Sequence, residues 1–294
     1  RGTTAIGYNA LYSQNSDSND EETGNVAVGY EAGYGLTTAQ HNTYLGFRAG
    51  ATNTTGGTNI AIGSQAMYDT DAGSTSLGST DNIFIGRNSG GGTWADAASN
   101  QNCAIGHFSM DAALNGALNN TALGNYSLSA LTTGDSNVAL GYAAGAALTT
   151  GHSNVLIGRA VAQTATDLTS AVMIGFAAGA SINTNNSQGS VLIGYNAGAT
   201  QTGGVNTFIG YDSGRYNKAG TANTFVGYEA GTYATGSSNT FMGYQAGRGS
   251  SSVPYASRGN NTAIGYKAFY EATTAQMNSI LGQEAGEKIT EGET

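Results

Sequence analysis

The side chains that most often perform chemistry are scarce in this chain and share no spacing. The histidines are His41, His107 and His152, and the single cysteine is Cys103. A general base works beside the proton that it abstracts and is commonly oriented by a carboxylate, yet no carboxylate recurs at a fixed distance from these histidines. Cys103 falls in a column of β-branched residues and is interpreted as a core residue. The sequence therefore predicts no catalytic residue and no enzyme.

One acidic stretch has a spacing that a metal ion could use. In Asp17-Ser-Asn19-Asp20-Glu21-Glu22, oxygen-bearing side chains alternate as they do in a calcium-binding loop. Such a loop also needs a turn glycine at its sixth position and a bidentate glutamate further on, and both are missing. We interpret the stretch as a solvated acidic loop. Phosphate-binding loops and Cys/His clusters are absent as well, so no metal and no cofactor is predicted.

Aromatic side chains are the remaining candidates for a binding site. Trp94, the only tryptophan, lies in the insertion from 90 to 100, where an exposed indole could stack on a sugar ring. The alternative, which we favour, is that Trp94 closes the local core. Tyr12, Tyr68 and Tyr255 are further candidates for contact with a receptor.

A short repeat runs through the whole chain and must position all of these residues. Asn206 to Gly214, Asn-Thr-Phe-Ile-Gly-Tyr-Asp-Ser-Gly, occurs with variations sixteen times, most often at a 17-residue step. A fixed short period indicates stacked units, none of which can bury its apolar face alone. The four longest steps, which end at Gly29, Gly86, Gly106 and Gly265, predict insertions that leave the stack as lateral loops.

The residues just before the first glycine of each repeat, here called the repeat glycine, predict a short strand. The residue three before it, the β-branched column, is mostly Thr, Val or Ile, and the residue one before it, the aliphatic column, is always aliphatic or Met. Strand side chains alternate between faces, and β-branched residues suit a pleated surface. We therefore expect these two columns to face the core. The aliphatic column consists of Ile6, Val28, Leu45, Ile62, Ile85, Ile105, Leu123, Leu140, Ile157, Ile174, Ile193, Ile209, Val226, Met242, Ile264 and Leu281.

The residue two before the repeat glycine, the middle column, should then face outward, yet it is apolar too. It consists of Ala5, Ala27, Tyr44, Ala61, Phe84, Ala104, Ala122, Ala139, Leu156, Met173, Leu192, Phe208, Phe225, Phe241, Ala263 and Ile280. A strand that is apolar on both faces is covered on both sides. Sister chains are the favoured cover, and a second layer of a wide single-chain coil is the alternative. The residues expected to pack between chains are Leu156, Met173, Leu192, Phe208, Phe225 and Phe241.

Two further columns flank the strand. The asparagine column, four before the repeat glycine, holds Asn in thirteen of sixteen repeats. Asn tolerates left-handed backbone, and stacked Asn side chains can form a hydrogen-bonded ladder. The predicted ladder includes Asn25, Asn42, Asn59, Asn137, Asn154, Asn206, Asn223 and Asn239. The residue after the repeat glycine, the ring column, is usually Tyr or Phe; it is expected to shield apolar neighbours, and a glycan-binding strip is the alternative.

Composition narrows the possible partners. Charged residues make up 10% of the chain and its net charge is −9, so no basic stripe exists to bind nucleic acid. No apolar run is long enough to span a membrane. Richness in Ser, Thr, Asn and Gly with few lysines suits an extracellular protein on a cell surface or a virion. We expect one elongated repeat domain over residues 1–294, cut from a longer fibre.

The motif Asn-[Thr/Val]-Ala-Ile-Gly-x-x-Ala resembles the head repeats of trimeric autotransporter adhesins. The related Asn-Thr-x-Ile-Gly-Tyr-x-Ala-Gly is similar to repeats of phage tail fibres. Three chains that each wind a parallel β-roll are what this resemblance implies. Adhesin head repeats are typically shorter than 17 residues, which leaves the cross-section and handedness of the coil open.

The fold that we expect is all-β: a parallel β-solenoid or β-roll of about sixteen coils with a 17-residue base period, assembled as a homotrimer. The expected function is that of a structural or adhesive fibre segment that presents lateral loops to a glycan or protein receptor. A self-assembling filament without a receptor and an ice-binding solenoid are the alternatives. Hexapeptide acyltransferases share Ile-Gly-x-x-Ala, but they need three such turns per coil and a histidine base, so this activity is disfavoured.

Overall fold

A computed structural model describes residues 2–15, 23–70, 78–182, 188–251, 259–271 and 274–289. The chain divides into two compact units, Arg1–His152 and Ser153–Thr294. In its described residues, each unit contains eight three-residue strands, one for every repeat. The expected all-β parallel solenoid is therefore confirmed, unit by unit.

The strands coincide with the β-branched, middle and aliphatic columns, as their β propensity predicts. In the first unit they are β1 (Thr4–Ile6), β2 (Val26–Val28), β3 (Thr43–Leu45), β4 (Ile60–Ile62), β5 (Ile83–Ile85), β6 (Cys103–Ile105), β7 (Thr121–Leu123) and β8 (Val138–Leu140). In the second unit they are β9 (Val155–Ile157), β10 (Val172–Ile174), β11 (Val191–Ile193), β12 (Thr207–Ile209), β13 (Thr224–Val226), β14 (Thr240–Met242), β15 (Thr262–Ile264) and β16 (Ser279–Leu281).

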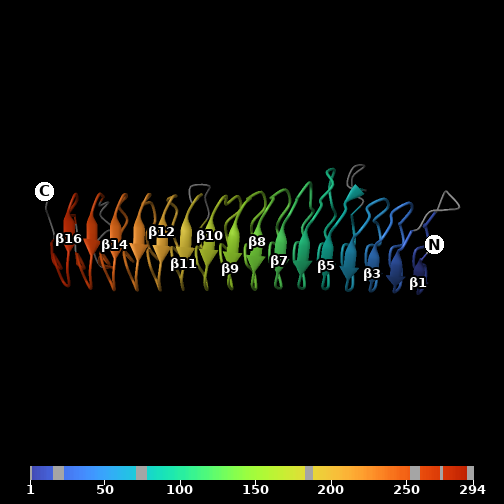
Figure 1. The fold of residues 1–294 in the computed structure, drawn as a ribbon, viewed down its shortest axis with the longest axis horizontal. Helices are drawn as coiled ribbons and strands as arrows, with labels where there is room; N and C mark the ends of the chain where they lie inside the picture. Colours follow the sequence, from blue (N-terminus) through green and yellow to red (C-terminus); the bar gives the residue numbers. More distant parts are fainter. Residues whose placement is uncertain are drawn as a thin grey trace. The chain divides into compact units, whose positions relative to one another are not determined.

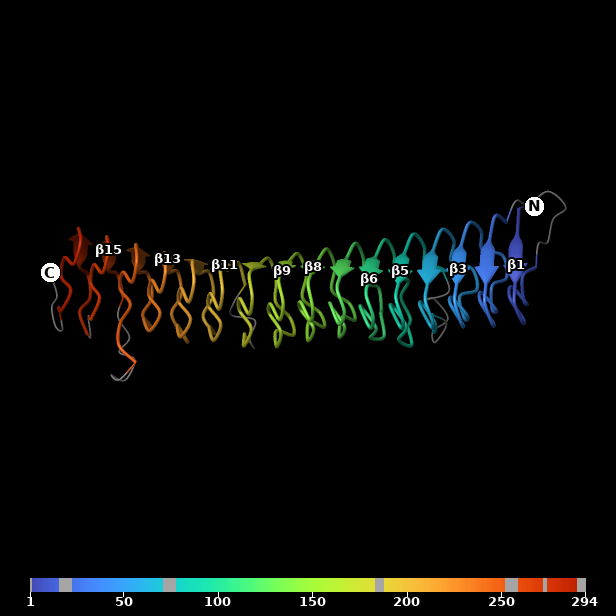
Figure 2. The same ribbon diagram turned by 90° about the horizontal axis from the view of Figure 1, so that it is seen from below.

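Within each unit every strand pairs in parallel with the next, and the register never slips. Ala104 of β6 lies opposite Ala122 of β7, and Phe208 of β12 lies opposite Phe225 of β13. The strand arrows of a unit consequently form a single row in Figure 1. Each coil returns to the next strand through an irregular segment on the opposite side (Figure 2). Every column of the sequence thus becomes a row of neighbouring side chains.

The irregular segments satisfy their backbone polar groups by stacking coil on coil. The amide of Glu31 donates to the carbonyl of Tyr8 at 2.8 Å, and that of Arg48 donates to Tyr30 at 2.8 Å. Further round the coil, the amide of Gly33 donates to Ala49 at 2.9 Å. Because buried backbone groups must be paired, this ladder lets a chain with only three-residue strands remain compact.

The two faces of the strand are the reverse of those predicted from the sequence. From Ala27 to Ala263 every middle-column residue is buried inside its own coil, whereas Leu45, Leu123 and Met242 of the aliphatic column are 45%, 45% and 41% exposed. Cys103, in the β-branched column, is only half buried. The alternation was correct but its phase was wrong, because apolar content is equal on both faces and cannot identify the inner one.

The prediction that six middle-column residues pack between chains is therefore wrong. The side chains of Leu156, Met173, Leu192, Phe208 and Phe225 are fully buried within the single chain, and Phe241 is 3% exposed. The irregular segment of each coil covers them, which makes them the core of the solenoid itself.

A size rule that links two columns could have identified the inner face. The residue four after the repeat glycine, here called the companion column, is Gly opposite eight of the nine large middle-column residues and Ala opposite Leu156. It is large opposite five of the seven alanines; Ala27 and Ala139 have Gly33 and Gly145 instead. Gly231 faces Phe225, and a Cβ on Gly231 would lie 2.4 Å from the ring. Ala104 is instead paired with buried Met110. The large companions are Leu11, Met67, Met110, Leu128 and Phe269. Protein interiors are close-packed, so two positions compensate in size only when their side chains fill the same core. This correlation therefore indicates that the middle column faces inward.

The repeat glycine is required by the stacking itself. Gly227 has a φ of 138°, and a Cβ there would lie 2.3 Å from the carbonyl oxygen of Gly243 in the next coil. That backbone conformation is reserved for glycine. Any other residue would separate two coils at the corner that follows the strand.

Candidate functional site

The outward face of the strands is the first candidate interaction surface. Its aliphatic column is 36% to 45% exposed at Leu45, Ile105, Leu123, Leu140, Ile209, Met242 and Ile264. The β-branched column, half buried or exposed, shares this face. Both columns are apolar or hydroxyl-bearing and carry no charge. Contiguous exposed apolar patches on soluble proteins mark sites of interaction.

The ring column forms an unbroken aromatic stack in the second unit. Centroids of successive rings are 4.9 to 5.3 Å apart and the ring planes lie within 11° of parallel. The members are Phe176, Tyr195, Tyr211, Tyr228, Tyr244 and Tyr266. Cations cover its two ends, because Arg159 lies over Phe176 at 5.5 Å and Lys267 over Tyr266 at 5.5 Å. The ring faces are thus occupied, and only their edges and hydroxyl groups meet the solvent.

In the first unit the ring column is interrupted. Tyr8, Tyr30 and Phe47 stack at 5.3 Å, but the next four repeats carry Ser64, Arg87, His107 and Asn125. Aromatic side chains reappear one position later in two of these coils, where Phe108 and Tyr126 stack at 5.4 Å. This interruption is the largest change in surface chemistry along the ring column.

The asparagine column forms the expected ladder inside the coil. In most coils the side-chain oxygen of the column's Asn accepts a hydrogen bond from the backbone amide of the next Asn. The amide of Asn42 donates to Asn25 at 2.8 Å, and that of Asn223 donates to Asn206 at 2.9 Å. Asn59, Asn137 and Asn239 continue the pattern. In the second unit Asn154 instead accepts from the amide of Ala171, because Ala171 and Ser190 replace Asn in two coils.

The reason given for asparagine was partly wrong. Left-handed backbone falls on the residue before the Asn, where His41, Thr58 and Asp81 have φ values of 60°, 56° and 59°. The Asn is selected for its side chain: the Nδ2 group of Asn25 also donates to the carbonyl of Ala39 at 2.7 Å. One side chain therefore pairs buried backbone groups on two sides of the coil.

The three candidate receptor contacts that the structure describes, Trp94, Tyr12 and Tyr68, differ in their environment. Trp94 is fully buried, packs edge-on against Phe84 with centroids 5.6 Å apart, and donates from Nε1 to the carbonyl of Gly90 at 3.1 Å. Its proposed contact with a receptor is therefore wrong, and the alternative of a core residue is confirmed.

Tyr12 is 67% exposed and stacks on Tyr34. Tyr68 is half buried beside Arg48. Tyr255, like the acidic stretch 17–22, lies outside the described residues.

Three ion pairs tie arginines to acidic residues near the ring column. Arg48 binds Glu31 at 2.7 Å, Arg215 binds Asp212 at 3.1 Å and Arg248 binds Glu229 at 2.7 Å. Desolvation of Glu229 acts to raise its pKa, but hydrogen bonds from Gln245 and Arg248 outweigh it, so the pKa lies below its usual value. These pairs are partly solvated, and such pairs contribute little to stability.

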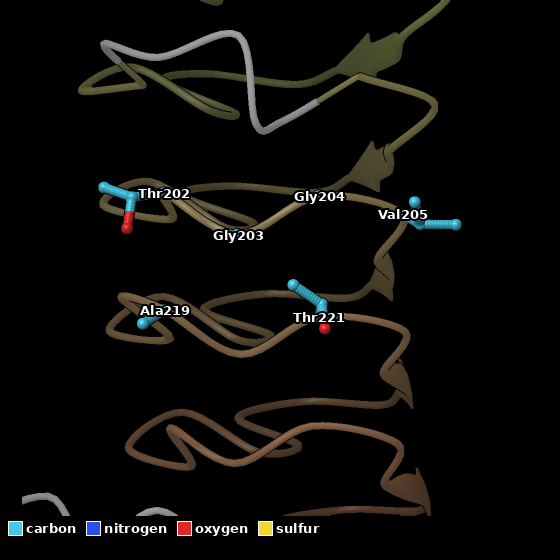
Figure 3. A pocket seen from close by; sticks show the side chains of 6 residues that line it. All are labelled: Thr202, Gly203, Gly204, Val205, Ala219 and Thr221. Atoms are coloured by element: carbon cyan, nitrogen blue, oxygen red, sulfur yellow. The ribbon is translucent and has the colours of Figure 1, made fainter.

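The second unit contains a shallow hollow between two neighbouring coils. It has a volume of about 340 Å³ and is lined by Thr202, Gly203, Gly204, Val205, Ala219 and Thr221. Figure 3 shows Thr202 and Ala219 at one end and Val205 and Thr221 at the other. The lining has no ionisable side chain that could act as a general acid or base.

Among the described residues, the structure brings none of the histidines, Cys103 or acidic side chains together as a chemical site. Within the described residues, no three His, Cys, Asp or Glu side chains lie close enough to hold a metal ion. The same residues include no helix of the length and apolarity needed to cross a bilayer. Comparisons with protein-family models, curated proteins and solved structures found no match to this chain. The outward face of the strands and the ring column are therefore the features of the molecule that bear on its function.

Proposed function

We propose that this chain is a segment of an extracellular fibre that assembles with copies of itself and serves a structural and adhesive role. The observation that carries this proposal is the exposed aliphatic column on the outward face of the strands. Burying apolar surface contributes roughly 25 cal/mol for each Å², so a row of half-exposed Ile, Leu and Met side chains favours association. The resemblance to adhesin heads and tail fibres supports a trimer.

The partner that best fits this face is another copy of the chain. The outward columns repeat once per coil with no slip of register within either unit. A surface with the same period can match such a row over many coils, whereas an ordinary globular surface matches only part of it. Closed symmetry is also the common arrangement of self-associating chains.

Substitutions on the outward face test the proposal. Replacing Ile209, Met242 and Ile264 with Asp places three charges on the exposed column of one unit. We expect the assembly to dissociate while each chain stays folded, because these side chains are outside the core. Analytical ultracentrifugation gives the mass, and circular dichroism checks the fold. The matched control carries Asp at Gln163, Ser170 and Ala219, which are exposed outside the strands; it should remain assembled.

One observation favours ice binding as a second candidate function. Thr207, Thr224, Thr240 and Thr262 lie in register on the outward face of four consecutive strands. A flat row of threonine methyl and hydroxyl groups at strand spacing can order water in a lattice. Thermal hysteresis of the purified protein would support this function, and its loss on changing these residues to Tyr would assign it to this row.

A further inference from the structure

The interruption of the ring column in the first unit leaves an unusual set of polar side chains. Arg87, His107 and Asn125 follow β5, β6 and β7 at the position that holds Tyr or Phe in most other coils. All three are exposed. We refer to Arg87, His107 and Asn125 as the polar window. Since the strands are in register, these side chains form a row about 10 Å long at ~4.8 Å per strand.

Hydrogen bonds within the polar window fix which side-chain atoms accept and which are left as donors. The backbone amide of Arg87 donates to Nδ1 of His107 at 3.1 Å, and the amide of His107 donates to Oδ1 of Asn125 at 2.9 Å. Because Nδ1 accepts, the proton of the neutral imidazole is on Nε2. Because Oδ1 accepts, the Asn125 amide presents its Nδ2 protons. Two backbone contacts therefore turn both side chains into donors.

Arg87 adds a positive charge that no carboxylate neutralises among the described residues. Its guanidinium lies over the ring of Phe108 at 5.3 Å, and Phe108 stacks on Tyr126. By contrast, Arg48, Arg215 and Arg248 are each ion-paired. Arg87 is thus oriented by an aromatic ring, and its N–H groups remain available for an anion.

An exposed ring borders these donors. Tyr126 is 42% exposed, with one face on Phe108 and a T-shaped contact with Tyr142 at 5.8 Å. Donors in a row beside tyrosine edges suit a ligand that carries oxyanions and C–H faces on one extended chain. Arginine and N–H donors bind carboxylate and sulfate oxygens with charge-assisted hydrogen bonds, and aromatic rings contact the apolar faces of sugars.

From this geometry we propose that the polar window binds an acidic polysaccharide, with a carboxylate or sulfate group held by Arg87, His107 and Asn125. The inference deepens the proposed adhesive function and rests on it. The net charge of −9 opposes acidic polymers at long range, but screening limits this repulsion to about 8 Å at physiological salt. Contact at the window then decides binding.

Binding to immobilised polymers tests this site in the full chain. Polygalacturonate supplies carboxylates, dextran sulfate supplies sulfates, and unmodified dextran supplies neither. We expect the wild-type protein to bind one or both acidic polymers and not dextran. The double variant Arg87→Gln, His107→Gln should bind roughly tenfold or more weakly, since it removes a positive charge and charge-assisted hydrogen bonds to the oxyanion. The polymer that shows this loss identifies the oxyanion.

The control variant is Arg159→Gln, which removes a cation from the same column, also over a phenylalanine ring, but with no polar window beside it. Retained binding by this control supports the site. Equal weakening in both variants would mean that net charge alone governs binding, which would overturn the proposal. A wild-type protein that binds neither acidic polymer would overturn it as well. Sedimentation of each variant distinguishes failure of this site from failure of the proposed fibre function, because loss of the polar window should leave self-assembly unchanged.

Discussion

The coils of β12 to β14 and those of β6 and β7 enclose the same cross-section with opposite choices of residue. In the first group, Phe208, Phe225 and Phe241 fill the core, and their rings stack 4.8 and 5.0 Å apart. In the second group the strand supplies only Ala104 and Ala122, and the core is filled from the other side of the coil by Met110 and Leu128. In these two groups of coils, residues from opposite sides of the coil therefore fill the core.

The outer surfaces of the two regions differ as well. The coils of β12 to β14 carry tyrosines whose ring faces cover one another, so these ring faces are not available to a ligand. The coils of β5 to β7 carry the polar window, whose three residues are exposed. The same repeat thus forms a stack of tyrosine rings in one region and a polar surface suited to a ligand in another. Core and surface vary independently because they occupy different columns.

The largest expected effect is at the repeat glycine. Gly227→Ala should destabilise the second unit by at least ~3 kcal/mol, because a backbone strain adds to a clash with the next coil. Gly282→Ala is the matched control: its φ is 129°, but the nearest atom to a Cβ is Ala285 Cβ at 3.8 Å. The control should show only the strain, about 1–3 kcal/mol. Urea denaturation measures the free energy of unfolding of both variants. Equal losses of stability would show that the contact between coils does not contribute.

A swap of core types tests the size rule directly. Phe225→Ala should cost about 3–5 kcal/mol through the cavity that it leaves, and Gly231→Met should destabilise by clashing with the ring. The double variant recreates the Ala–Met pairing of β6 in the setting of β13. We expect most of the loss to be recovered, with a coupling free energy of about 2 kcal/mol or more in urea denaturation. Additive losses would show that the columns do not share one core.

Much of this fold was predictable from the sequence, and the reasons for the failures are specific. The period, the strands and the asparagine ladder follow from columns with one residue type each. The inner face could not be assigned from polarity, because Phe225 and Val226 are both apolar. It follows from the pairing of Phe225 with Gly231, a correlation in size between distant positions. Trp94 shows the same limit, since nothing local distinguishes a buried insertion from an exposed one.

The candidate sites were less predictable than the fold. The polar window was missed because His107 was considered for catalysis, without regard to its neighbours one coil away. Its signal in the sequence is that Ser64, Arg87, His107 and Asn125 interrupt a column of rings. Backbone hydrogen bonds to Nδ1 of His107 and Oδ1 of Asn125 leave Nε2 and Nδ2 as donors, and only the structure supplies these bonds.

A change in the asparagine ladder should produce an intermediate effect. Asn120→Ala removes the acceptor for the amide of Asn137 and the donor to the carbonyl of Gly134, so we expect a loss of about 1–3 kcal/mol. Conversely, Ala171→Asn extends the interrupted ladder of the second unit beyond Asn154 and should stabilise it by roughly 1 kcal/mol. Hydrogen exchange of nearby amides measures both. A neutral result at Asn120 would mean that water replaces its side chain without loss.

The smallest effect concerns the pH dependence of Glu229. Its pKa is depressed in the folded chain, so its contribution is present above the unfolded pKa and is lost as the pH falls through the folded value. In Glu229→Gln, backbone amides near Arg248 should therefore exchange with solvent slightly faster than in the wild type at about pH 6. At about pH 3 their exchange rates should match the wild type. Hydrogen exchange at both values checks this. A difference that grows in acid would reverse the sign of the linkage.

The central claim is that the middle column holds each coil together while the aliphatic column joins chains. The mass of the native particle tests it most directly, measured by sedimentation for the wild type and for the Ile209, Met242 and Ile264 to Asp variant. We expect a multiple of 29.6 kDa for the wild type and a folded single chain for the variant. A wild-type particle of 29.6 kDa, with this face in water, would contradict the account.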